Sequence, residues 1–140
     1  MGAFFTLFVT AVILEQLQLS RARKAWAQAR ALGIEFSGEF PHLSMKRGLV
    51  SFASRMETGA KGARIYIQEY LVSGFHLDNA SQSLALRSEI QRAEELGLRF
   101  DWYTHELKAT CQGIPLPDDV LERIDALATV VRVSSALKIS

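Results

Sequence analysis

Residues 2–14 read GAFFTLFVTAVIL, and no charged side chain interrupts this run. Wound into a helix, the run carries apolar side chains in every direction, and the large ones are Phe4, Phe5, Leu7, Phe8, Val9, Val12, Ile13 and Leu14. A helix that is apolar on every side is buried in protein or in lipid. The run therefore predicts an N-terminal helix that needs cover from something other than water.

A membrane is the first kind of cover that the sequence favours. The thirteen residues of the run rise about 20 Å as a helix, and an extension to Leu19 reaches about 27 Å, against roughly 30 Å for a hydrocarbon core. Three basic residues follow the run closely and none precedes it: Arg21, Arg23 and Lys24. Positive flanks stay in the cytoplasm, so the C-terminal domain is expected there, with Trp26 near the membrane interface. The sequence thus predicts a single transmembrane or membrane-associated segment.

Two other interpretations of the run stay open. The first is a helix that packs in the shared core of a soluble, cytoplasmic oligomer, and the shortness of the run supports it. The second is a cleaved signal peptide, although such peptides carry basic residues before the apolar part rather than after it. Under the first interpretation the helix is a protein interface, and under the second it is absent from the mature chain.

The composition of the whole chain favours helices. Of its 140 residues 49% are hydrophobic and 22% are charged, and only three are proline and nine glycine. So few helix breakers favour long helices over a fold with many turns. We therefore expect an all-α fold of about five helices in two parts. These are an apolar N-terminal helix with a basic extension at 1–32 and a helical bundle domain at 43–140.

Apolar spacing places the helices of the expected bundle at about 44–73, 79–96, 100–112 and from 117 onward. The longest rests on apolar residues three and four apart: Leu49, Phe52, Met56, Ala60, Ala63, Ile67 and Tyr70. Gly33 and Gly97, each followed by an apolar residue, are typical of Schellman helix ends. No segment alternates convincingly with a period of two, so no sheet is expected.

Charge and cysteine content restrict the partners. The net charge is +1, with nine basic and four acidic side chains in 1–64, and seven basic and eleven acidic ones in 65–140. This distribution is too dilute for a nucleic-acid footprint, so no nucleic-acid partner is predicted. Cys111 is the only cysteine, which excludes an internal disulfide and a cysteine-based zinc site. We expect no cofactor and no metal.

Arg99 and His105 have the spacing R-x5-H. This resembles the short motif of the HEPN family of small all-helical ribonucleases, in which the two side chains lie together in a bundle and act on RNA phosphodiesters. The resemblance covers seven residues and implies catalytic roles for Arg99 and His105 in a small ribonuclease or toxin. No serine nucleophile motif, phosphate loop or paired-carboxylate motif accompanies it.

The leading functional hypothesis from these features is a non-enzymatic accessory or scaffolding subunit of a membrane-associated complex. Its N-terminal helix would be the anchor, and its partners would be other protein subunits in a hetero- or homo-oligomer. The first alternative is a soluble helical structural or assembly protein whose N-terminal helix packs in an oligomer core. The second alternative is the HEPN-like ribonuclease or toxin.

Overall fold

The structure is a computed structural model that describes residues 2–72, 84–101 and 106–139. For residues 2–5, 8 and 135–139 it describes the backbone and not the side chains. Its helices are α1 (Gly2–Ala31), α2 (Leu84–Glu95) and α3 (Pro117–Ile139). Its strands are β1 (Ser37–Glu39), β2 (His42–Arg47), β3 (Val50–Thr58), β4 (Arg64–Val72), β5 (Arg99–Asp101) and β6 (Leu107–Gln112). A short 3-10 turn, Ala60–Gly62, lies between β3 and β4.

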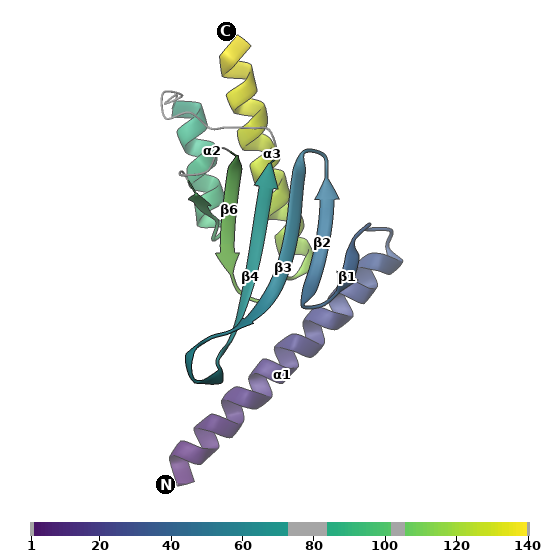
Figure 1. Ribbon diagram of the computed structural model, residues 1–140, viewed down its shortest axis with the longest axis vertical. Coiled ribbons are helices and arrows are strands. Elements are labelled where there is room, and N and C mark those ends of the chain that lie inside the picture. The colour runs from purple at the N-terminus through teal and green to yellow at the C-terminus, as the bar shows by residue number, and fades with distance from the viewer. Residues whose placement is uncertain (1, 73–83, 102–105, 140) are drawn as a thin grey trace.

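The strands form one antiparallel sheet in the order β1-β2-β3-β4-β6-β5 (Figure 1). The first four are neighbours in both sequence and space, and β6 then pairs with β4 and carries β5 on its outer side. Each edge strand has only three residues. Such short edges leave little unpaired backbone to which another chain could add a strand.

The helices cover one face of the sheet. In β4 every second residue is buried, namely Tyr66, Gln68, Tyr70 and Val72, and α2 and α3 lie over that face (Figure 1). The second half of α1 joins the same layer, because its Trp26 stacks on Phe52 of β3. The result is a two-layer α/β fold in which no described helix covers the opposite face of the sheet, called here the open face, as antiparallel sheets permit.

The expectation of an all-α helical bundle over 43–140 is wrong. The segment expected to be one long helix at 44–73 forms the antiparallel strands β2, β3 and β4, and the segment at 100–112 forms β5 and β6. The helices expected near 79–96 and from 117 onward are present as α2 and α3. The beginning of the former, before residue 84, lies outside the described residues.

The sheet is hard to predict because β4 has apolar side chains on both faces. Ile65, Ile67 and Leu71 are half-buried on the open face, while the inward row contains the polar Gln68. The strict alternation of apolar and polar residues that is typical of a strand is thereby lost. Apolar residues three and four positions apart, the spacing of a helix, can be found in the same segment. The β-branched and aromatic content of RIYIQEYLV at 64–72 is the better indicator of structure here.

The glycine helix ends predicted from the sequence are confirmed. Beyond α1 the amide of Gly33 donates to the carbonyl of Arg30, and the amide of Ile34 donates to that of Ala29, both at 3.1 Å. The same pair of bonds recurs at Gly97 after α2, and both glycines have positive φ, +91° and +93°. These are Schellman motifs, and each directs the chain into an edge strand, β1 or β5.

Within the part of the chain that the structure describes, no helix is long and apolar enough to cross a membrane. This finding corrects the expectation of a transmembrane helix at the N-terminus. The helix itself is present as α1.

Candidate interaction surface

The second half of α1 is built into the body of the protein. Its buried side chains share one side of the helix, and they are Leu19, Ala22, Trp26 and Ala29. Because these positions are three and four residues apart, they form a single stripe. The stripe fixes this half of the helix against the core.

Trp26 is the main anchor of that stripe. Its side chain is 2% exposed, its ring stacks on Phe52 at a centroid distance of 6.4 Å, and Phe36 packs edge-on at 5.0 Å. Its indole Nε1 donates to the carbonyl of Pro115 at 2.9 Å. Since Pro115 lies between β6 and α3, this bond joins the first helix to the C-terminal part of the fold. Trp26 therefore lies in the core and not at the membrane interface where the sequence placed it.

The first half of α1, residues 2–17, extends past the end of the sheet and is called here the projecting segment (Figure 1). Leu7 is 70% exposed and Leu17 is 61% exposed. The other large exposed side chains of the segment are Val9, Val12, Ile13 and Leu14. Monomeric proteins rarely leave a contiguous apolar surface of this kind uncovered. The side chains of Phe4, Phe5 and Phe8 lie outside the described part of the structure.

The exposed apolar residues surround the projecting segment. At about 100° per residue, Leu7 and Leu14 lie within about 20° of each other, whereas Val9 lies about 160° away from Leu7. Ile13 and Leu17 occupy directions between these two sides. A single flat partner would therefore cover only part of the segment.

Polar groups within the projecting segment bond to their own helix. Thr10 Oγ1 donates to the backbone carbonyl of Thr6 at 2.8 Å. This back-bonding satisfies the hydroxyl locally. The Thr10 hydroxyl therefore needs no hydrogen bond from a partner.

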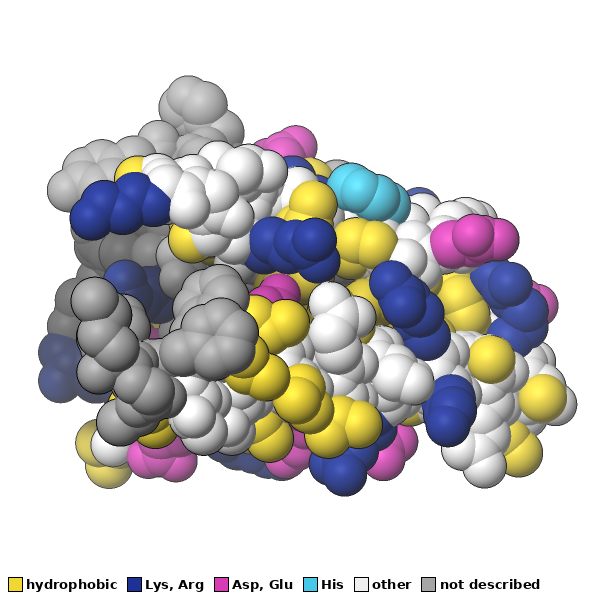
Figure 2. Space-filling model, turned by 90° about the horizontal axis from the view of Figure 1, so that it is seen from below, with side chains coloured by type: hydrophobic (Ala, Val, Ile, Leu, Met, Phe, Trp, Pro, Cys, Tyr) yellow, Lys and Arg dark blue, Asp and Glu magenta, His cyan; other side chains and the backbone are white. Residues whose placement is uncertain are grey.

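Basic side chains surround the point where the projecting segment joins the body. Arg21, Arg23 and Lys24 are all exposed. Seen from the N-terminal end, Lys and Arg side chains are interspersed with apolar ones (Figure 2). The apolar segment therefore ends in a positively charged base.

A buried hydrogen-bonded network links the sheet to the helices. Gln68 Oε1 accepts from Tyr70 Oη at 2.8 Å and from Arg123 Nη1 at 3.1 Å, and Gln68 Nε2 donates to the carbonyl of Gly113 at 3.1 Å. Arg123 Nε also donates to the carbonyl of Leu96 at 2.9 Å. Both Gln68 and Tyr70 are almost fully buried. A satisfied network of this kind holds β4, α3 and the end of α2 in one arrangement.

The titratable groups beside this network are kept neutral. Burial raises the pKa of the Cys111 thiol, against the opposing effect of Arg123. Burial also raises the pKa of Tyr70 above its usual range, and the neighbouring Cys111 adds to this. A thiol with a raised pKa is a poor nucleophile.

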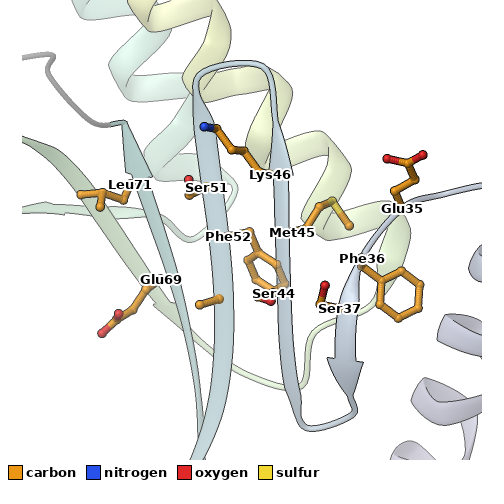
Figure 3. Close-up of a pocket in the computed structure, with 11 residues that line it drawn as sticks. Glu35, Phe36, Ser37, Ser44, Met45, Lys46, Ser51, Phe52, Glu69 and Leu71 are labelled. Atoms are coloured by element: carbon orange, nitrogen blue, oxygen red, sulfur yellow. The ribbon is translucent and has the colours of Figure 1, made fainter.

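The open face of the sheet carries a hollow of about 630 Å³ (Figure 3). Its polar lining includes Ser44, Ser51 and Glu69. Arg55 pairs with Glu69 and also with Glu57, whose Oε1 lies 2.8 Å from Arg55 Nε. Glu69 is held in the pair with Arg55, and Glu35 and Lys46 also line the hollow.

The structure places Arg99 in β5, at the edge of the sheet, where it pairs with Thr110 of β6. His105 lies outside the described residues, so the two side chains cannot be placed together. The all-helical fold implied by the HEPN resemblance is not the fold of this chain. Among the described residues, no group of three or more His, Cys, Asp or Glu side chains could hold a metal ion.

The polar residues of the open face and of the network are not identified from the sequence. Arg55, Gln68 and Glu69 all fall in the segment expected to be helical, where they occupy ordinary solvent-facing positions. The signal that could have revealed them is the alternation along 64–72, in which Gln68 is flanked by inward aromatic residues two positions away.

Comparisons with protein-family models, with curated proteins and with solved structures found no match.

Proposed function

We propose that this protein is a structural or assembly subunit that associates with further copies of itself through the projecting segment. The observation that carries the proposal is the exposure of six large apolar side chains on a helix whose other half is fixed in the body. Complete burial of such a side chain contributes about 1.5–3 kcal/mol. Several partly exposed side chains therefore provide a substantial driving force for association.

A second copy is the occupant that best fits this surface. Each copy presents the same apolar helix, so the segment is complementary to itself. Because apolar side chains surround the helix, neighbours are needed on more than one side. The proposal therefore favours an assembly of more than two copies, with the projecting segments in a shared core.

Charge complementarity supports contacts between copies. Arg23 and Lys24 are exposed at the base of the segment, and Asp118 and Asp119 are exposed at the start of α3. Within the described residues, no ion pair joins these groups to any partner. Opposite charges that are unpaired within one chain can pair between chains and align them.

The test is the mass of the full chain in solution, measured by light scattering after gel filtration. The variant Leu7→Gln, Leu14→Gln, Leu17→Gln makes the segment polar with residues that helices tolerate. The matched control, Leu32→Gln, Leu49→Gln, Leu84→Gln, changes three equally exposed leucines outside the segment. We expect the native chain and the control to form a defined oligomer, and the segment variant to be a monomer with unchanged circular dichroism.

A native chain that is monomeric at all concentrations would overturn the proposal. So would a segment variant that keeps the oligomer while the control loses it, because the interface would then lie on the body.

A further inference from the structure

A groove of about 590 Å³ lies where α1 meets the lower end of the sheet. Its walls come from three places far apart in the sequence. They are Gln18 and Arg21 of α1, 64–66 at the start of β4, and Gln112, Gly113, Ile114 and Leu116 around the end of β6. This volume falls within the range of about 300–1,000 Å³ that is common for small-molecule sites.

Among the described residues that line the groove, two are arginines and none is acidic. Arg21 and Arg64 line it, and within the described residues neither forms an ion pair. Arg55 on the open face, by contrast, is paired with two glutamates. An arginine side chain is charged at all relevant pH values and binds oxyanions through two parallel hydrogen bonds. The two guanidinium groups therefore lack the counter-charge that an anion would supply.

Neutral donors and apolar walls complete the groove. Gln18 and Gln112 carry side-chain amides, and Tyr66 adds an aromatic wall whose ring stacks on Phe40. Ile114 and Leu116 give aliphatic contacts. A Cβ built on Gly113 would meet no atom within 4 Å, so the protein leaves open space at that wall.

We propose that this groove binds a small amphipathic anion, with a phosphate or carboxylate head between Arg21 and Arg64 and a short apolar chain against the aliphatic wall. The charge selects the head and the apolar wall selects the body of the ligand. Since α1 and β4 each supply one arginine, the bound head would join the base of the projecting segment to the sheet. This site is independent of the self-association proposed above.

The test uses the full chain and three probes in calorimetric titration: hexyl phosphate, inorganic phosphate and hexanol. We expect hexyl phosphate to bind saturably, inorganic phosphate to bind at least about tenfold more weakly, and hexanol to show no saturation. The double variant Arg21→Gln, Arg64→Gln should weaken hexyl phosphate binding by at least about tenfold, because it removes the charged hydrogen bonds to the head.

The matched control is Lys24→Gln, Lys61→Gln. It removes the same two charges from the same helix and from the turn before β4, yet neither lysine lines the groove. The affinity of this control variant for hexyl phosphate should stay within about twofold of the native value. Equal losses of hexyl phosphate affinity in the two double variants would indicate diffuse charge attraction and overturn the proposal. The absence of saturable hexyl phosphate binding to the native chain would also overturn it.

Two further measurements separate this proposal from the previous one. Circular dichroism of each variant establishes that its fold is retained. The mass of each variant reports self-association, which the groove variant should leave unchanged. Loss of binding with an intact oligomer supports the groove, and loss of both together would show that the groove is part of the interface between copies and would overturn the small-ligand site.

Discussion

At the scale of single residues, Trp26 is the main anchor of α1 on the body. Its ring fills the space between α1 and β3, and its indole N–H is held by the carbonyl of Pro115. Both contacts are buried, so neither can be exchanged for water at low cost. Within the buried stripe of α1, Trp26 is thus the side chain that supplies both a ring contact and a hydrogen bond to the body.

We predict that Trp26→Ala lowers the free energy of unfolding by about 3–5 kcal/mol, the usual cost of removing a large buried aromatic side chain. Trp26→Phe should cost about 1–3 kcal/mol, because it keeps a ring but leaves the carbonyl of Pro115 without its donor. Urea unfolding followed by circular dichroism measures both. Leu32→Ala, at an exposed position just beyond α1, is the control and should change little.

If Trp26→Ala lowers the free energy of unfolding no more than Leu32→Ala does, the anchoring role of Trp26 is contradicted.

Cys111 and Tyr70 make stability depend on alkaline pH. Burial raises the pKa of both above their ordinary values of 9.0 and 10.0. The unfolded chain therefore releases these protons at a lower pH than the folded chain does. The contribution to stability is complete below about pH 9 and is lost as the pH rises toward the folded pKa values.

We expect the free energy of unfolding to fall by about 1–2 kcal/mol between about pH 8 and about pH 10.5. The double variant Tyr70→Phe, Cys111→Ala lacks both groups, so its stability should fall less steeply over the same interval, whatever its absolute value. Urea unfolding at each pH gives the two slopes. Identical slopes would show that these two groups do not cause the effect.

At the scale of elements, α1 combines an anchored half with an exposed half. The helix ends at Gly33 and Gly97 and the start of α3 at Pro117 are predictable, because each depends on a few adjacent residues. The strands of 44–72 are not, because Gln68 faces inward while Ile65, Ile67 and Leu71 line the other face. Short sequence motifs therefore predict the ends of the helices, whereas they do not predict the sheet.

We predict that deletion of 2–16 leaves the body folded. The side chains described in this part of α1 are exposed apart from the half-buried Glu15, so their removal takes little from the core. The thermal midpoint should change by no more than a few degrees, and the circular dichroism should keep its strand contribution. Collapse of the fold on deletion would mean that the segment packs against the body.

At the scale of the whole molecule, a folded body carries the apolar half of one helix away from itself (Figure 1). The apolar run is predictable from 2–14 alone, because it depends on composition rather than on contacts. The groove between α1, β4 and β6 is not, since Arg21, Arg64 and Gln112 come together only when the chain folds. The surface proposed for self-association is thus visible in the sequence, and the proposed ligand site is not.

The most direct test of the central claim is the accessibility of the projecting segment in the assembly. A single cysteine is placed at Ile13→Cys, in a Cys111→Ala background, and its alkylation rate is measured over a range of protein concentrations. Leu49→Cys, at an exposed position between β2 and β3, is the control. We predict that alkylation at position 13 slows as the concentration rises, while the rate at position 49 stays constant. Equal and unchanging rates at the two positions would contradict burial of the segment between copies.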